Sequence, residues 1–317
     1  MRYINTLKDG DRITEIYLCK KKTSGVAKNG KTFESLTLVD KTGSIDAKIW
    51  DPDSAGIGSY EELDFIEVTG NIQTYMGYLQ MSISRLRKAN ANEYDPAEFV
   101  PTSEKNIDDM YSELMGIIDS INAPYMKTLI NHFIKDDNKL VMDFKRQSAA
   151  KSVHHGFAGG LLEHTLSVTK NCVFFAERYP FLNRDLLLTA SILHDIGKLQ
   201  ELSDFPKNDY TDEGQMLGHI YMGAEMVSRV IDDIEGFPPT RKTELIHCIL
   251  AHHGELEFGS PKKPAIAEAM ALSFADNIDA KMETFYEALK NTDSKDLSWQ
   301  GFNRYIDSNI RNTLVTE

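Results

Sequence analysis

The hydrophobic pattern of this chain of 317 residues changes its period once. Up to about residue 90, polar and apolar side chains alternate in short runs such as Phe33–Asp40, the period of a half-buried strand. From Ile107 onward, apolar residues recur at the three- and four-residue spacing of helices. Since strands and helices bury their apolar residues with different periods, we expect two domains. The sequence predicts an all-β barrel in residues 1–90, a turn-rich linker in 91–106 and an all-α domain in 107–317.

Five alternating runs make up the first region. They cover residues 11–18, 33–40, 44–50, 64–72 and 78–83. Turn residues separate them, the last turn being Met76-Gly77. Five short strands suit a small closed barrel. Their order, with Gly43, Ile45, Ala47 and Trp50 in a Gly-x-Ile-x-Ala-x-x-Trp run, resembles the OB-fold of nucleic-acid-binding proteins.

Positive charge is concentrated in this first region. The whole chain has a net charge of −13, but residues 1–90 hold 13 basic and 12 acidic residues. A local patch, more than net charge, decides whether a polyanion binds. We therefore expect a platform for single strands, with lysines along the phosphates and aromatic rings stacked on bases. The candidates are Lys20, Lys21, Lys22, Phe33, Trp50, Tyr75 and Tyr78. The alternative, that most of these aromatic rings fill the barrel core, stays open.

Cysteine content and hydropathy indicate the compartment. The chain has three cysteines without a paired spacing, so neither a disulfide framework nor a thiolate zinc site is expected. No stretch approaches 18 uninterrupted apolar residues, and the first residues have no apolar signal-peptide core. We therefore expect a cytoplasmic protein without a membrane segment.

Histidine and aspartate side chains recur at the ends or early turns of separate predicted helices. His194-Asp195 follows the apolar run 186–193, where two desolvated polar groups are costly unless a ligand compensates them. The other candidates are His164, His219, His252, His253 and Asp276. Side chains from facing helices can converge in a bundle interior, and imidazole with carboxylate suits divalent first-row metals. The sequence predicts a metal site within residues 160–280.

The order His164, His194-Asp195, Asp276 resembles the HD superfamily of metal-dependent phosphohydrolases. This resemblance implies one metal on His164, His194, Asp195 and Asp276. It implies a second metal on His219, His252 and His253, with Asp195 bridging the two. Two divalent ions per chain are expected; manganese is favoured, and iron, cobalt and zinc are alternatives. Lys198, one turn beyond Asp195, is expected to neutralise phosphate charge during catalysis.

A narrower resemblance covers nearly the whole chain. The OB-like region, the segment 159–166 (Gly-Gly-Leu-Leu-Glu-His-Thr-Leu) and His-His-Gly followed by Phe258-Gly-Ser-Pro261 are similar to the YhaM-type 3′–5′ exoribonucleases. The resemblance implies two-metal-assisted hydrolysis of single-stranded RNA, with single-stranded DNA as a further candidate, to nucleoside monophosphates. His154 and His155 precede the glycine pair and are candidates for substrate contact. A homo-oligomer is left open.

Two other functions stay open at this point. One is a nucleic-acid-binding replication or regulatory factor whose HD domain is structural or weakly active. The other is an HD phosphodiesterase acting on a nucleotide or cyclic dinucleotide. The sequence after His194-Asp195 lacks the Glu-Asp pair of stringent-nucleotide hydrolases, and Phe258–Pro261 replaces the Gly-Tyr-Pro of one cyclic-dinucleotide group. Exoribonuclease activity is therefore the preferred prediction.

Overall fold

The structure is a computed structural model that describes all residues except 27–29, 76–77, 152–154, 291, 293–295 and 314–317. The chain divides into two compact units. The first comprises Met1–Thr102 with Asp204–Asn208, and the second comprises Ser103–Ser203 with Asp209–Glu317. Each unit has its own apolar core, as the change in hydrophobic period predicts.

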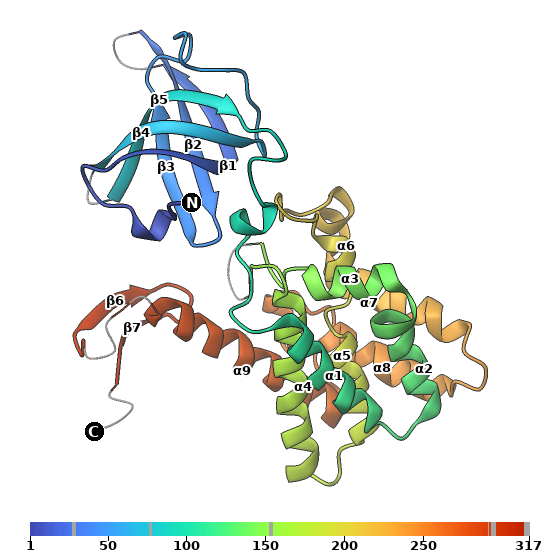
Figure 1. Cartoon of the computed structure of the whole chain (residues 1–317). Helices are drawn as coiled ribbons and strands as arrows, with labels where there is room; N and C mark the ends of the chain where they lie inside the picture. The colour runs from blue at the N-terminus through green and yellow to red at the C-terminus, as the bar shows by residue number, and fades with distance from the viewer. Residues whose placement is uncertain (27–29, 76–77, 152–154, 291, 293–295, 314–317) are drawn as a thin grey trace. The chain divides into compact units, whose positions relative to one another are not determined.

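A closed five-stranded barrel forms the first unit (Figure 1). Its strands are β1 (Arg12–Val26), β2 (Thr32–Asp40), β3 (Gly43–Ile49), β4 (Phe65–Tyr75) and β5 (Tyr78–Lys88). They follow one another around the barrel in the order β1-β2-β3-β5-β4, and β1 pairs with β4 to close it. The β3–β5 pairing is parallel and the others are antiparallel. This is the predicted OB topology; the Met76-Gly77 turn lies outside the described residues.

Small and aliphatic side chains fill the barrel. Leu38, Ala47, Ile66 and Met81 are completely buried on successive strands, as the period-two pattern requires. Tyr17 is a buried aromatic residue of this core, and its hydroxyl donates to the Arg2 carbonyl. Tyr60 is buried in the same core, so both of these aromatic rings come from residues outside the predicted stacking set.

The predicted linker is partly folded onto the barrel. A short helix, η2 (Pro96–Phe99), begins after Asp95, whose side chain accepts from the amide of Ala97. Phe99 is buried against Phe65 and Tyr94, with ring centroids 5.1 and 5.9 Å away. The turn-rich sequence predicts a linker here. The structure differs because the Phe99 ring packs against apolar side chains of the barrel. The first unit consequently extends to Thr102.

Helices dominate the second unit. They are α1 (Ile107–Asp119), α2 (Pro124–Asn131), η3 (His132–Asp136), α3 (Asn138–Arg146), α4 (Gly160–Arg178), α5 (Arg184–Leu193), α6 (Lys198–Glu201), α7 (Asp212–Asp232), α8 (Pro239–Ala251), η4 (Leu256–Phe258) and α9 (Ala267–Leu289). The central helix is α5, whose residues 186–193 are all buried. It packs against α2, α4, α8 and α9, so its C-terminal end lies inside the bundle. None of the described helices is long and apolar enough to cross a membrane.

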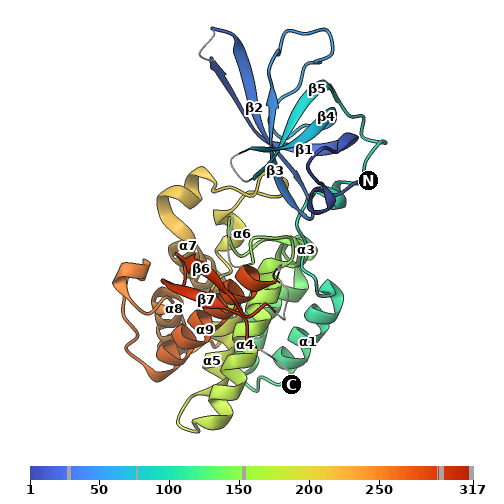
Figure 2. The ribbon, with the colours of Figure 1, turned by 90° about the vertical axis from the view of Figure 1, so that its left-hand side faces the viewer.

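The all-α expectation is wrong at the C-terminal end. Two short strands, β6 (Trp299–Asn303) and β7 (Ser308–Arg311), pair as an antiparallel hairpin beyond α9 (Figure 1 and Figure 2). Trp299 and Phe302 are exposed, and a register shift lies between them, so the hairpin lacks the alternation of a half-buried strand. Periodicity therefore gave no signal for it.

Candidate active site

Helix ends bring the predicted ligands together. His164 lies in the second turn of α4, and Asp276 lies on α9. His194 and His252 are the residues that follow the last turns of α5 and α8. In both, the ring Nδ1 lies against the carbonyl three residues earlier, Ser191 at 2.8 Å and Ile249 at 2.7 Å. Because a helix end leaves carbonyls unpaired, these bonds hold each ring with Nε2 pointing onward.

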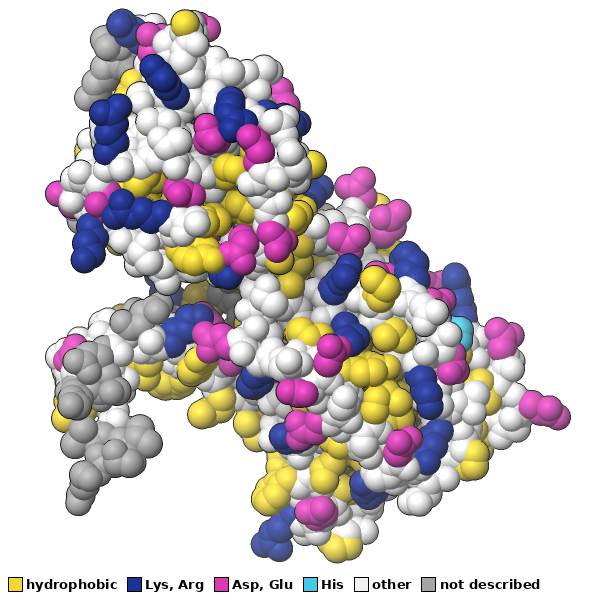
Figure 3. Space-filling model, viewed as in Figure 1, with side chains coloured by type: hydrophobic (Ala, Val, Ile, Leu, Met, Phe, Trp, Pro, Cys, Tyr) yellow, Lys and Arg dark blue, Asp and Glu magenta, His cyan; other side chains and the backbone are white. Residues whose placement is uncertain are grey.

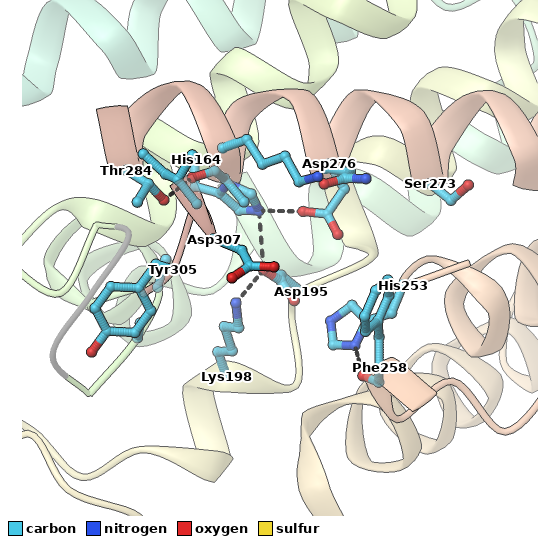
Figure 4. Close-up of a pocket in the computed structure, with 16 residues that line it drawn as sticks. His164, Asp195, Lys198, His253, Phe258, Ser273, Asp276, Thr284, Tyr305 and Asp307 are labelled. Atoms are coloured by element: carbon cyan, nitrogen blue, oxygen red, sulfur yellow. Dashed lines mark hydrogen bonds and ion pairs between the residues drawn. The ribbon is translucent and has the colours of Figure 1, made fainter. Parts of the chain in front are cut away.

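Three of the ligands lie around one oxygen of Asp195. Its Oδ2 is 3.3 Å from His164 Nε2 and 3.4 Å from His194 Nε2. Asp276 Oδ1 completes the group, 3.2 Å from His164 Nε2 and 4.0 Å from His194 Nε2. The structure thus brings together the four residues that were predicted to hold the first metal. Figure 4 shows three of them, His164, Asp195 and Asp276.

The other oxygen of Asp195 faces a second histidine group. Asp195 Oδ1 is 3.4 Å from His219 Nε2 and 3.6 Å from His252 Nε2. His253 joins them, with ring centroids 5.3 Å from His219 and 4.3 Å from His252. Its Nδ1 lies 2.8 Å from the Phe258 carbonyl, which leaves Nε2 as its ligand atom. Asp195 therefore lies between the two predicted ligand sets with one oxygen toward each.

The donor atoms of the second group fit a bound cation. Asp195 Oδ1, His219 Nε2 and His252 Nε2 are buried, and none of them has a hydrogen-bond partner among the described residues. Buried polar atoms normally have a partner, and leaving one without costs about 1–3 kcal/mol. Three such atoms converge here, each with a lone pair available to a metal. The residues present therefore fit a divalent metal of the imidazole- and carboxylate-binding kind.

Two carboxylates that the sequence did not single out orient the histidines. Asp279 Oδ2 lies 2.7 Å from His164 Nδ1, and Glu201 Oε1 lies 2.9 Å from His219 Nδ1. A kink at Gly218 lets the His219 amide donate to the same Glu201 oxygen, 2.9 Å away. Such partners fix the ring tautomer and raise the basicity of the ligand nitrogen. Asp279 lies one turn after Asp276, a spacing that could have indicated it.

The charged groups of this buried cluster shift one another's pKa values. Burial opposes ionisation of Asp195, but Lys198 and His194 hold its pKa well below the usual range. The carboxylates likewise outweigh burial at His164 and hold its pKa well above that of free histidine. His252 is different, because burial and the neighbouring His253 hold its pKa well below the usual value. His252 is therefore neutral at neutral pH, whereas His164 would release its proton when a metal binds.

Lys198 lies at the base of the site. Its ammonium is 2.5 Å from Asp195 Oδ2, and Asp195 raises its pKa against the effect of burial. A charged amine is therefore fixed next to the ligands, as predicted. Of the two histidines expected to contact substrate, His154 lies outside the described residues. His155 is buried, with Nε2 2.9 Å from Asp279 Oδ2, so its contact in the structure is with this carboxylate.

An open pocket of about 630 Å³ lies over the cluster (Figure 4). His164, Asp195, Lys198, His253 and Asp276 form its base. The rest of the wall comes from α9, from Phe258 and from the turn between β6 and β7. Sites for small ligands typically measure 300–1,000 Å³, so a nucleotide fits this volume.

On the barrel, the predicted binding residues lie mostly on the surface. Trp50, Tyr75 and Tyr78 have 50%, 59% and 80% of their area exposed, so these three rings are not core residues. Phe33 is half-buried, with its ring 5.7 Å from that of Trp50. Lys48, which sequence reasoning missed, lies over the Phe33 ring at 5.1 Å.

The predicted lysines differ in their surroundings. Lys20 and Lys21 are exposed, whereas Lys22 lies 3.2 Å from Glu34 and over the Tyr60 ring at 4.1 Å. Lys21 and Lys48 line a groove of about 250 Å³ that crosses β1, β2 and β3. Figure 3 shows several Lys and Arg side chains on the visible face of the barrel, interspersed with acidic ones.

These two units define the class of protein. The helical unit carries the ligand order of an HD domain, and the model of the HD domain family matches residues 161–281. The chain is thus an HD-domain protein with an N-terminal OB-type barrel. It is 34% identical over 282 residues to the 3′-5′ exoribonuclease YhaM of Bacillus velezensis, covering 89% of this chain and 88% of the relative. The chain therefore belongs to the YhaM exoribonuclease family.

Two solved structures that the chain resembles are of replication protein A. The second OB-fold domain of replication protein A from Methanococcus maripaludis is 23% identical and covers 30% of this chain and 96% of its own, with a TM-score of 0.24. A replication protein A heterotrimer bound to single-stranded DNA is 16% identical and covers 28% of this chain and 66% of its own, with a TM-score of 0.22. The OB assignment of this barrel rests on its strand order.

Proposed function

We propose that this protein is a metal-dependent 3′–5′ exoribonuclease that hydrolyses single-stranded RNA to nucleoside monophosphates. The observation that carries this proposal is the placement of Asp195, with one carboxylate oxygen toward each of two ligand groups at the base of an open pocket. Membership in the YhaM family supports the substrate and the direction of attack.

The site would hold two divalent ions. His164, His194 and Asp276 would hold one, His219, His252 and His253 the other, and Asp195 would contact both. Imidazole with carboxylate suits manganese, which we favour, as well as iron, cobalt and zinc. When bound, such a pair activates water at neutral pH and stabilises charge on the attacking and leaving oxygens of an in-line displacement.

The chain's own residues position the substrate for this reaction. Lys198, half-buried beside Asp195, offers its ammonium to a phosphate that carries increasing negative charge during cleavage. Asp279 holds His164, and Glu201 holds His219, so the ligand nitrogens stay aimed at one point before substrate arrives.

We propose that the barrel binds the single strand. Trp50, which is exposed, and Phe33, which is half-buried, form an aromatic pair, and Lys21 and Lys48 line the neighbouring groove. Stacking on such rings is largely independent of sequence, and phosphate contacts add affinity that falls with salt. Single-stranded RNA is the expected partner, with single-stranded DNA as a second candidate.

The test is the substitution Asp195→Ala, with end-labelled RNA and manganese. Removing a ligand shared by both groups should lower the rate by about 10³-fold or more, since metal stabilisation of the transition state is worth several kcal/mol. Strand binding, measured by fluorescence anisotropy, should change little because the barrel is untouched. A variant with wild-type activity would refute the assignment.

The same assay separates the alternatives. A replication or regulatory factor with a structural HD domain would bind the strand and release no mononucleotide in wild-type form. A phosphodiesterase for nucleotides or cyclic dinucleotides would cleave those compounds and leave RNA intact. Product analysis with time therefore distinguishes all three.

A further inference from the structure

The pocket extends beyond the ligand cluster along one face of α9. Ser273, Asp276, Ala280, Lys281 and Thr284 line it, at the three- and four-residue spacing of a single helix face. In Figure 4, Thr284 and Tyr305 lie at one end of the pocket and Ser273 and Phe258 at the other, with the ligands between them. A strand whose cleaved phosphate lies at the ligands would therefore have a nucleotide at each end.

The two ends differ in charge. Lys281 is exposed and lines the pocket, and its Cα lies about 7.5 Å beyond that of Asp276 along the helix axis, on the Thr284 side. Lys198 is already bonded to Asp195, whereas no described residue forms an ion pair with Lys281. The residues that line the pocket include no further Lys or Arg.

The hairpin supplies an aromatic residue at this same end. Tyr305 lies in the turn between β6 and β7 and lines the pocket, with 66% of its area exposed. An exposed ring and a cation that line one pocket can together bind a nucleotide, the ring by stacking and the cation by phosphate contact. Asp307, also in this turn, is acidic, which leaves Lys281 as the group that a phosphate would meet here.

We propose that this end is a subsite for the nucleotide on the 5′ side of the cleaved phosphodiester. Lys281 binds the next phosphate upstream, and Tyr305 stacks on the base of that nucleotide. The direction in which the RNA strand lies in the pocket follows from the chemistry of the substrate. This step rests on the proposed function. The last nucleotide of an RNA ends in a 3′ hydroxyl and has no further phosphate, so the cationic end suits the upstream side. Lys281 and Tyr305 are thus positioning residues for each successive cleavage.

The test for Lys281 uses two RNA strands of the same sequence. One has phosphates throughout, and the other has an uncharged methylphosphonate at the second linkage from the 3′ end. Release of the first nucleotide is measured in single turnover for wild type, Lys281→Ala and Lys281→Arg. Lys290→Ala is the matched control, since Lys290 follows the same helix but does not line the pocket.

We expect Lys281→Ala to slow cleavage of the all-phosphate strand about tenfold, the effect of losing one hydrogen bond to a charged group. It should change cleavage of the methylphosphonate strand less than twofold, while Lys281→Arg and Lys290→Ala stay near wild type. Equal effects of Lys281→Ala on both strands, or none on either, would overturn the subsite. Wild-type protein that releases no nucleotide from RNA would overturn the proposed function itself.

Tyr305 is tested with an abasic residue at the penultimate position. Tyr305→Ala should slow cleavage of the normal strand about tenfold, because stacking on one base is worth about this factor or more. Tyr305→Phe should retain the rate, and Tyr305→Ala should have little effect on the abasic strand. Phe302→Ala, an exposed aromatic residue of the same hairpin outside the pocket, is the control. A Tyr305→Ala effect that is equal on both strands would contradict stacking.

Discussion

Single hydrogen bonds decide which atom of each histidine faces the centre of the site. For all five histidines of the cluster, Nδ1 lies against a carbonyl or carboxylate oxygen. Nε2 is left for the centre in each case. A free imidazole in water has no such preference, so these five bonds prepare the ligand set before any metal arrives. Asp195 completes the arrangement because its two oxygens point to different groups.

At this scale we predict that Asp279→Asn weakens metal binding. The amide removes the negative charge that His164 Nδ1 now meets at 2.7 Å, so His164 becomes a less basic ligand. Loss of a residue that hydrogen-bonds a metal ligand typically lowers metal affinity or activity by 10–100-fold. The manganese concentration giving half-maximal activity should rise by this factor. Glu287→Gln, an exposed carboxylate of α9, is the control; a matching shift in the control would contradict this role.

At the scale of elements, close contact between the loop after Asp195 and α7 determines where His219 lies. Gly197 has ordinary helical backbone angles, so a side chain is excluded there by space alone. A Cβ at this position would lie 2.1 Å from the His219 carbonyl oxygen and 2.6 Å from the Gly223 amide nitrogen. The glycine that follows the His194-Asp195 pair is therefore what allows the second ligand group to approach Asp195.

We predict that Gly197→Ala separates these elements. Overpacking of this kind costs about 1–3 kcal/mol, and activity should fall more than stability because His219 moves away from Asp195. Thermal unfolding should shift down by about 2–12 °C, at about 2–4 °C per kcal/mol for a unit of this size. Gly116→Ala in α1 is the matched control. No atom lies within 4 Å of its Cβ, and alanine should stabilise that helix by about 0.5–1 kcal/mol.

On the barrel, an ion-pair network joins β4, β5 and the following turn. Arg87 lies 2.7 Å from Glu67 and 2.8 Å from Glu93. Arg87 lowers the pKa of Glu93 to about 2. A lowered folded-state pKa means that the stabilisation is present above the ordinary value near 4.5. It is lost as the pH falls toward 2.

The corresponding prediction concerns acid unfolding. In urea titrations, wild type should be more stable than Glu93→Gln at pH 6, and the difference should shrink steadily between pH 5 and pH 2. The network is exposed, so added salt should reduce the difference as well. A difference that grows toward low pH would contradict the sign of the pKa shift.

At the scale of the whole molecule, the chain has two cores in two units, and the proposed function assigns strand binding to one and chemistry to the other. Each unit buries its own apolar cluster, and the residues around Asp195 all belong to the helical unit. The helical unit should therefore keep its chemistry without the barrel. The barrel should contribute affinity for strands long enough to reach it.

We predict that deleting residues 1–102 weakens cleavage of long RNA far more than hydrolysis of a small phosphodiester. Stacking and phosphate contacts are worth about 1–3 kcal/mol per base, so the KM for a long strand should rise at least tenfold. The rate on bis(p-nitrophenyl) phosphate should stay within a few-fold of wild type. Loss of both activities in a folded truncated protein would contradict the division of roles.

The sequence alone determined the two domains, the OB topology and the ligand candidates. Period two and period 3.6 are local properties of a chain, and the order His164, His194-Asp195, Asp276 is readable without coordinates. Tertiary structure decided what depends on packing between distant segments. It placed Trp50, Tyr75 and Tyr78 on the surface and brought Asp279 to a histidine 115 residues earlier.

Tertiary structure also decided what has no periodic signal. The hairpin of β6 and β7 is largely exposed, so no alternation marks it, and its turn nevertheless contributes Tyr305 to the pocket wall. The two oxygens of Asp195 are equivalent in sequence, and only the positions of α4, α5, α7 and α8 direct them to different histidines. The physical reason is that a sequence pattern specifies which face of an element is buried. The distances across the bundle follow from how those faces pack.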